Sequence, residues 1–381
     1  MAKLGEVCKL NMGQSPDSSS YNCIGDGIPF FQGNADFGEI HPNIRVWCNA
    51  PTKIAHPGEI LISVRAPIGA MNIADCECCI GRGLASISAD EAVCTTKYLW
   101  YGISSKIEEL NAKGTGSTFK AINKKTLEEA EIPSRDLMEQ ERIAANLDRV
   151  TALISLRKQQ ITKLDELVKA RFVEMFGDLA APQCEYPELK LVDVCADADD
   201  IKCGPFGTQL NKDEYKTKGV AVWEIPQINS GFSEMPTHFI TEEKAVILNA
   251  YSIEPGDIAM SRKGNVGKCG LFPENFKKGI IHSDVLRIRV DKRKVDSCFM
   301  MYQLHFSEAV KRQIEMVSSG AIMAGINVTK LKQIKVRIPE LENQRMFAVF
   351  VERVDQQKQT VQQSLEKLEL MKKALMQEYF G

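Results

Sequence analysis

The stretch from Gly264 to Cys269 carries glycines and a lysine spaced much as in a loop that cradles phosphate groups. A phosphate loop of this type also needs a glycine at position 262, where Arg262 stands, and a hydroxyl side chain at the position of Cys269. Because both are missing, the stretch does not predict a nucleotide site.

Catalytic chemistry has equally little support elsewhere. A nuclease-like set can be drawn from Asp213, Glu242 and Lys244, but such loose spacing is typical of solvated charges in loops. The sequence contains no Pro-Pro pair, so it lacks the Asp/Asn-Pro-Pro-Tyr/Phe stretch that amino-methyltransferases use. We therefore predict no catalytic residue, no cofactor and no enzyme activity in this chain.

The cysteines include one cluster, Cys76, Cys78 and Cys79. A structural zinc site requires a second pair of ligands at comparable spacing, and the next cysteine, Cys94, stands alone. The five histidines stand singly, without a neighbouring acid or nucleophile pattern. Free thiols are thus favoured over zinc, and no metal site is predicted.

Polar and basic residues close after apolar strands form a better candidate set, because the end of a strand can present side chains to a DNA groove. Arg can bind guanine through two hydrogen bonds, Gln and Asn can bind adenine in the same way, and Lys more often holds phosphate. Any single member could be an ordinary surface charge, so the prediction rests on the set. The candidate DNA-binding residues are Gln32, Asn34, Arg65, Arg82, Lys113, Lys120, Arg262, Lys263, Lys268, Lys277 and Lys278.

The elements that must position these residues occur twice. Each copy has a short strand ending in aromatics, a Pro-Gly turn leading into a second strand, a third apolar strand, a glycine-containing run ending in Ile-Asn, and a closing Ile-Pro. The paired stretches are 27–31 with 219–223, 57–63 with 255–261, 84–87 with 285–288, 115–123 with 319–327, and 132–133 with 338–339. This pattern predicts two similar domains of mixed α/β class.

Each copy leads into a long helix, 137–177 and 341–381, which lacks Pro and ends on Phe-Gly. Both helices carry an apolar seam with alternating spacings of four and three, as in a coiled coil. The seam residues are Ile143, Leu147, Val150, Ile154, Ile161, Leu164 and Val168 in the first helix, and Val351, Val354, Val361, Leu365, Leu368 and Leu375 in the second. Four charged residues interrupt these seams: Arg157, Arg171, Lys358 and Lys372. They either fix the register of the helix pair, or snorkel to water along the seam, or form a docking surface for a partner.

The order of domain, helix, domain, helix implies that the two seams pair antiparallel within one chain. A rod of roughly 55 Å would then separate two similar domains related by a pseudo-two-fold axis. The predicted domains are 1–136 and 178–340, separated by spacer helices 137–177 and 341–381. Two binding domains held apart by a spacer suit duplex DNA. Two half-sites face the same side of the duplex when they are about 10 base pairs, some 34 Å, apart.

Composition limits the remaining possibilities. The formal net charge of −2 means that any DNA-binding surface must concentrate its positive charge locally, or share phosphate contacts with a partner. The twelve scattered cysteines and an N-terminus without an apolar signal region predict a cytoplasmic protein with reduced thiols. No apolar run approaches the length of a membrane span.

The residues together resemble the specificity subunits of type I restriction-modification systems. The likeness rests on the Pro-Gly-Glu/Asp-Ile strands, on the glycine-containing run ending in Ile122-Asn123, and on Ile132-Pro133 followed by Leu137, Gln140, Arg142 and Ile143. It covers essentially the whole chain, once per half. The second copy departs from it with Ala321-Ile322 in place of Ser117-Thr118, and with Met346 in place of Arg142.

This resemblance implies a non-catalytic subunit whose two target recognition domains each read one half of a bipartite duplex DNA target. It also implies that two modification (methyltransferase) subunits bind the helices, and that restriction subunits join through that complex. The alternatives are the separate specificity chain of a type IIB restriction enzyme and a coiled-coil scaffold that binds protein rather than DNA. Steep salt dependence of binding to duplex DNA would separate the DNA readings from the scaffold.

Overall fold

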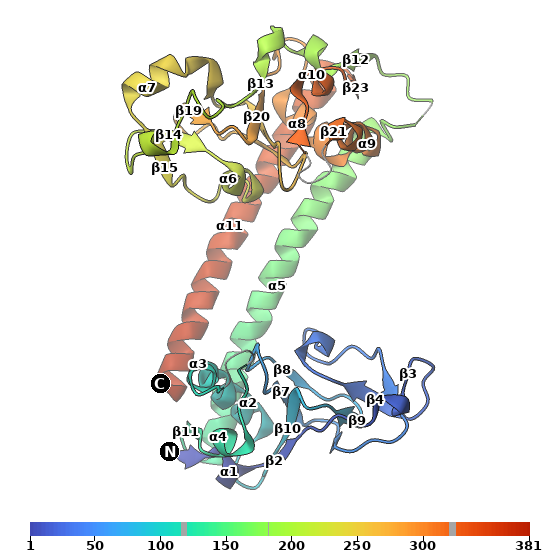
Figure 1. The fold of residues 1–381 in the computed structure, drawn as a ribbon, viewed down its shortest axis with the longest axis vertical. Helices are drawn as coiled ribbons and strands as arrows, with labels where there is room; N and C mark the ends of the chain where they lie inside the picture. The colour runs from blue at the N-terminus through green and yellow to red at the C-terminus, as the bar shows by residue number, and fades with distance from the viewer. Residues whose placement is uncertain (116–119, 182, 320–324) are drawn as a thin grey trace. The chain divides into compact units, whose positions relative to one another are not determined.

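The computed structural model describes residues 1–115, 120–181, 183–319 and 325–381 (Figure 1). These residues form two compact units, one of Met1–Gln159 with Gln362–Gly381 and one of Gln160–Val361. We call them unit 1 and unit 2. Parts of the repeated glycine-containing runs, 116–119 and 320–324, lie outside the described residues. Within the described ranges, no helix is both long and apolar enough to cross a membrane.

Unit 1 contains an antiparallel sheet in the order β2-β10-β7-β8. The central strand β7, Ile60–Ser63, is buried along its whole length. Its side chains alternate between two cores: Ile60 and Ile62 pack with the helices, whereas Leu61 packs against the other face. The other strands of this sheet are β2 (Cys8–Met12), β10 (Leu84–Ala89) and β8 (Met71–Ile73).

A second sheet in unit 1 has the order β3-β5-β4-β9-β6, in which β4 and β9 are parallel. Its strands are β3 (Tyr21–Asn22), β5 (Trp47–Cys48), β4 (Ile28–Phe31), β9 (Cys78–Ile80) and β6 (Ile54–Ala55). The remaining elements are β1 (Ala2–Lys3) paired with β11 (Glu131–Ile132), the helices α1 (Leu4–Val7), α2 (Thr96–Ser105), α3 (Ile107–Ala112) and α4 (Lys124–Glu128), and the 3-10 turns η1 (Ser18–Ser20) and η2 (Asn34–Asp36).

Unit 2 has the same plan. Its first sheet is β13 (Ile201–Cys203), β20 (Val285–Ile288), β17 (Ile258–Ser261) and β18 (Cys269–Leu271), and its second is β15 (His238–Ile240), β14 (Val220–Trp223), β19 (Gly279–Ile281) and β16 (Ser252–Ile253). Two further pairs are β12 (Glu188–Lys190) with β23 (Lys335–Arg337), and β21 (Ser318–Ser319) with β22 (Gly325–Ile326). The helices are α6 (Ile225–Asn229), α7 (Glu242–Ile247), α8 (Ser297–Phe306), α9 (Glu308–Val317) and α10 (Val328–Leu331), with 3-10 turns η3 (Leu191–Val194), η4 (Ala198–Asp200), η5 (Lys212–Glu214) and η6 (Asn249–Tyr251).

The predicted internal repeat is confirmed in both sheets, although β3 of the five-stranded sheet is not matched in the four-stranded sheet of unit 2. The order β2-β10-β7-β8 recurs as β13-β20-β17-β18, and the parallel pair of β4 with β9 recurs as β14 with β19. In each unit a further strand, β6 or β16, adds antiparallel to the parallel pair. The chain is therefore a duplication of one mixed α/β unit, as the paired stretches predict.

The long helices are α5, Leu137–Phe176, and α11, Leu341–Phe380. Gly177 follows α5 with φ +68°, a left-handed conformation that a glycine adopts without strain. In unit 1, Ile143 and Leu147 share a core cluster with Phe380, and Arg157 Nε donates to Ser364 Oγ at 3.2 Å. In unit 2, Phe172 packs on Phe347 and Lys358 bonds Asp165. In both units, higher numbers on one helix meet lower numbers on the other, so the helices pair antiparallel.

The seam positions carry the contact between the two helices. Ile143, Leu147, Val150, Ile154, Leu164, Val168, Val351, Val354, Val361 and Leu365 are buried, and Ile161, Leu368 and Leu375 are half-buried. The charged interruptions also reach across the pair: Lys358 Nζ lies 2.5 Å from Asp165 Oδ1, and the Arg171 guanidinium lies 5.7 Å from the centre of the Phe350 ring. These contacts favour a role in fixing register.

Candidate nucleic-acid interface

The ends of four neighbouring segments meet along one line of backbone hydrogen bonds in unit 1. The N–H of Val64, just past β7, donates to Gly83 O at 2.9 Å, and Val64 O accepts from the N–H of Ile122 at 2.9 Å. The N–H of Gly81, just past β9, donates to Phe31 O at the end of β4. We call this set of segment ends the strand exit of unit 1.

Unit 2 repeats the strand exit bond for bond. Arg262 N donates to Asp284 O at 2.9 Å, and Arg262 O accepts from Ile326 N at 3.1 Å. His282 N donates to Trp223 O at 2.9 Å, as Gly81 N does to Phe31 O. Two copies of one backbone frame therefore carry different side chains.

Four candidate residues come together at the strand exit of unit 1. Gln32 and Arg82 are exposed and share Ser15, whose hydroxyl bonds both the Gln32 amide and the Arg82 N–H. Arg65 and Lys120 are exposed on the adjoining segments, where Ala66 N donates to Lys120 O at 3.0 Å. Exposed amide and guanidinium groups on these hydrogen-bonded segment ends have the chemistry that base edges and phosphates require.

Glycines on both sides of Arg82 allow this close packing. A Cβ at Gly81 would lie 2.7 Å from Gln32 Oε1, and a Cβ at Gly83 would lie 2.5 Å from Gln32 O. Neither position could hold a larger residue without moving Gln32. The sequence Gly-Arg-Gly thus lets the backbone on both sides of Arg82 lie against Gln32.

The other two candidates of unit 1 stand apart from these bonds. Asn34 is half-buried at the start of η2. Lys113 follows α3 and pairs with Glu109 at 2.6 Å, a contact that raises the pKa of Lys113. For Lys113, this intrahelical type of pair favours an ordinary surface charge over a DNA contact.

Three candidate cations of unit 2, Arg262, Lys263 and Lys268, interact with other residues of their own chain. The Arg262 guanidinium lies 5.2 Å from the centre of the Phe206 ring, and its Nε donates to Ile326 O. Lys263 Nζ pairs with Asp284 at 2.8 Å, and Lys268 Nζ donates to Asn229 O at 2.8 Å. Gly264–Lys268 forms a turn between the antiparallel strands β17 and β18, not a loop that opens a helix.

Lys277 and Lys278 do not join the strand exit of unit 2. Both are exposed and precede β19, whereas His282 of the strand exit follows the other end of that strand. Lys278 pairs with Glu254 at 2.8 Å. They are cations at the far end of β19.

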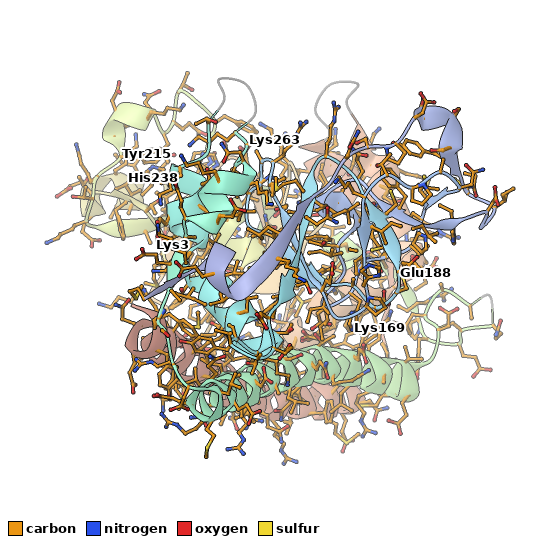
Figure 2. All side chains as sticks on the ribbon, turned by 90° about the horizontal axis from the view of Figure 1, so that it is seen from below. Lys3, Lys169, Glu188, Tyr215, His238 and Lys263 are labelled. Carbon is orange, nitrogen blue, oxygen red and sulfur yellow. The ribbon has the colours of Figure 1, made fainter. Side chains whose placement is uncertain are left out.

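Four residues that the sequence analysis did not select line a cavity of about 680 Å³ in unit 2: Tyr215, Glu224, His238 and His282. Glu224 Oε2 lies 2.7 Å from His238 Nδ1, and Glu224 Oε1 lies 3.9 Å from His282 Nε2. The ring of His238 stacks on Tyr215 with centroids 4.6 Å apart, and Figure 2 shows these two side chains together. Burial first, and then the charges of Glu224 and Asp284, raise the pKa of Tyr215.

The alignment of the two repeated strands could have identified Glu224 from the sequence. It follows Trp223 at the end of β14 as Gln32 follows Phe31 at the end of β4. A search restricted to cations and amides passes over it because it is an acid. His238 and Tyr215, by contrast, reach the cavity only through the pairing of β15 with β14 and the bridge of Lys216 with Phe239.

The remaining chemically suggestive residues have structural surroundings. Cys78 and Cys79 are fully buried in β9, and burial raises the pKa of the Cys78 thiol to about 12. Lys244 pairs with Glu214 at 2.6 Å rather than with Asp213 or Glu242.

Comparisons with known proteins agree with this architecture. Residues 1–166 and 197–370 match the family model described as the type I restriction modification DNA specificity domain. A protein described as the MjaX type I restriction enzyme specificity subunit of Methanocaldococcus jannaschii is 43% identical over 161 residues, which are 42% of this chain and 38% of that protein. The MjaVIII type I restriction enzyme specificity subunit of the same organism is 23% identical over 294 residues, 73% of this chain and 68% of that protein.

Among solved structures, the type I restriction-modification S subunit from M. genitalium has the same fold. It superposes with a TM-score of 0.63 over 100% of this chain and 95% of that chain, at 17% sequence identity. The match with the MjaX protein spans well under half of that relative's length. Since the family model covers most of both units, this chain belongs to the type I restriction modification DNA specificity domain family.

Proposed function

We propose that this chain is the DNA sequence-specificity subunit of a type I restriction-modification complex. In this proposal, unit 1 and unit 2 each read one half of a bipartite duplex target. The observation that carries the proposal is the strand exit, one backbone frame built twice with different polar side chains. A duplicated frame suits two half-sites, and different side chains suit two different base sequences.

This proposal assigns a role to each predicted segment. Segments 1–136 and 178–340 would be the target recognition domains, and 137–177 and 341–381 the spacer helices. The candidate contacts at the strand exits are Gln32, Arg65, Arg82 and Lys120 in unit 1, and Arg262 and Lys263 in unit 2. Methyl transfer would belong to a partner subunit.

We assign the outer faces of α5 and α11 to the docking of two modification subunits, with restriction subunits joining through that complex. Large apolar side chains lie exposed on both helices, among them Leu156 at 57% and Leu370 at 69%. Exposed apolar side chains outside the seam suit a protein partner. The paired helices would also set the gap between the two half-sites.

The test is to express the chain with the methyltransferase encoded beside it and to map methylated adenines by single-molecule sequencing. A bipartite motif with a fixed gap, lost when this chain is omitted, is the expected result. A stable complex without any motif would contradict the specificity role. Binding of the purified complex to duplex DNA should weaken steeply as salt rises, because phosphate contacts release counterions. Salt-independent behaviour would favour the protein scaffold.

A further inference from the structure

Gln32 and Glu224 occupy the same place in the two units. Each directly follows the strand that pairs in parallel with β9 or β19, and the residue before each accepts an equivalent hydrogen bond, Phe31 O from Gly81 N and Trp223 O from His282 N. The equivalence therefore rests on backbone hydrogen bonds and strand order, and does not depend on matching side chains.

The two side chains also point toward equivalent neighbours. Gln32 Oε1 lies against Gly81 and bonds Ser15, two residues past Gly13, whose N–H donates to Leu84 O. In unit 2 the matching bond runs from Gly204 N to Val285 O. Glu224 lines its cavity together with Pro205, next to Gly204, and with His282, which stands at the position of Gly81. Both side chains thus face the same corner of the strand exit.

The chemistry at this corner differs in one respect. A glutamine amide has a donor and an acceptor side by side, which match N7 and the N6 amine of adenine in the major groove. An ionised glutamate can only accept, so it suits the N4 amine of cytosine; adenine also offers an N6 amine, but its neighbouring N7 acceptor repels a carboxylate.

Glu224 retains the acceptor capacity that this contact needs. Oε2 of Glu224 is hydrogen-bonded to Nδ1 of His238 at 2.7 Å. Oε1 is 3.9 Å from His282 Nε2, which is too long for a hydrogen bond. The N–H of Asp284 donates to His282 Nδ1 at 3.2 Å, so Nδ1 is the acceptor of that ring. His238 therefore holds Oε2, and the Glu224 side chain lines the cavity with its Oε1 not hydrogen-bonded to His282.

From this geometry we propose that Gln32 and Glu224 are equivalent specificity-determining residues, with Gln32 reading an A·T pair in one half-site and Glu224 reading a C·G pair in the other. The inference rests on the proposed function and assigns the base preference of one position in each half. His238 is a positioning residue, because it orients Glu224 without contacting the base itself.

The experiment exchanges the two side chains in the full-length chain, purified with its methyltransferase, as Glu224→Gln and Gln32→Glu. Each complex selects sequences from a randomised duplex library at near-physiological salt. Glu224→Gln should change one base pair of one half-site from C·G to A·T by about tenfold, and Gln32→Glu should make the reverse change in the other half-site, since one good base contact discriminates by about 1.4 kcal/mol. The untouched half-site is the internal control for folding.

A third variant, His238→Ala, distinguishes base recognition by Glu224 from the positioning of Glu224 by His238. It should weaken binding yet keep the C·G preference, because the carboxylate remains. If Glu224 serves only to hold His238, then Glu224→Gln and His238→Ala will act alike and neither will change a base. Unchanged bases in both exchange variants, or changes at several positions at once, overturn the inference.

The outcomes are distinguishable from a failure of the proposed function. A wild-type complex that selects no bipartite sequence refutes that function, and the inference with it. A wild-type motif that both variants leave intact refutes only the inference. If Glu224→Gln abolishes all sequence selection, the inference is tested by Gln32→Glu alone, because Gln32 is exposed.

Discussion

The two strand exits hold their cations differently. In unit 1, Arg65 is exposed, whereas at the equivalent position Lys263 pairs with Asp284 at 2.8 Å. The pair in unit 2 lies partly out of water, with the two side chains 39% and 27% exposed, so part of its charge is neutralised within the chain. Unit 1 therefore offers the freer positive charge to phosphate or guanine.

Replacing Arg65 by Ala should impair recognition of only one half-site. The loss of an Arg contact to a base would lower binding about 5- to 100-fold and relax the preference at one base pair. Selection from a randomised duplex library measures both effects. Lys9→Ala is the matched control, because Lys9 is an exposed cation near the start of β2, away from Gly13 at its other end. An equal loss at both half-sites would refute the assignment of Arg65.

Thiol reactivity follows burial in the same residue-by-residue way. Removal from water raises the pKa of Cys8, Cys94, Cys195 and Cys269 to about 12. Because these folded-state pKa values lie far above pH 8, the thiols stay protonated and unreactive there.

We expect iodoacetamide at pH 8 to modify the exposed Cys23 well before these four thiols, and to modify all twelve cysteines once urea unfolds the chain. Mass spectrometry of peptides over time measures the order, and Cys23→Ser removes the fast phase. Native labelling of Cys269 as fast as Cys23 would show that its surroundings open to solvent.

At the scale of elements, each long helix is tied to its own unit by a buried glutamine. Gln140 Oε1 accepts from Thr95 N at 2.9 Å, and Gln344 Oε1 accepts from Asp296 N at 2.9 Å. Thr95 and Asp296 are the N-caps of α2 and α8. The first turn of a long helix thereby completes the cap of a short one, in both copies.

Gln344→Ala should lower the free energy of unfolding of unit 2 by about 2–3 kcal/mol. The change leaves Asp296 N and Pro339 O, which Gln344 now bonds at 2.9 and 2.6 Å, without that partner in a buried site. Hydrogen exchange of the α8 amides measures the loss. Gln357→Ala, at an exposed position of the same helix, should change stability by less than about 0.5 kcal/mol. Equal effects of the two variants would contradict this role.

A cluster of aromatic rings joins α5 to α8 and α11 in unit 2. Phe172 lies 5.2–5.8 Å between ring centroids from Phe176, Phe299, Phe306 and Phe347. Phe172→Ala should therefore cost about 3–5 kcal/mol of stability. The neighbouring Val173 is 52% exposed, and Val173→Ala should stay within about 0.5 kcal/mol. Chemical unfolding of both variants makes the comparison, and a mild Phe172→Ala phenotype would mean that the cluster repacks.

At the scale of the whole molecule, the chain leaves unit 1 along α5 and returns to it along α11. Both termini consequently belong to unit 1, where Leu4 and Phe380 share one core cluster. Because the chain returns along α11, a single chain supplies both helices of the paired spacer. Our proposal that the helices set the gap between the half-sites follows from this arrangement.

Removing one matched heptad from each helix, residues 157–163 and 359–365, should shorten that gap. The 4,3 alternation of the seam survives the deletion, and seven residues at about 1.5 Å each remove roughly 10 Å, or about three base pairs of duplex. Mapping methylated adenines with the shortened complex measures the new gap. Deleting the segment from α5 alone should disrupt pairing and abolish the motif. An unchanged gap in the matched deletion would refute the spacer role.

Local patterns in the sequence determined the long helices, their seams and the repeated strands. These depend on periodicity, Pro and Gly placement and apolar runs, which act over a few residues and are written twice. The tertiary structure alone decided which polar side chains meet. Lys263 pairs with Asp284, Lys277 and Lys278 lie at the far end of β19, and His238 contacts Glu224 from β15 while Tyr215 stacks on His238. Such contacts join residues far apart in the chain through strand pairing and register, which spacing along the sequence does not encode.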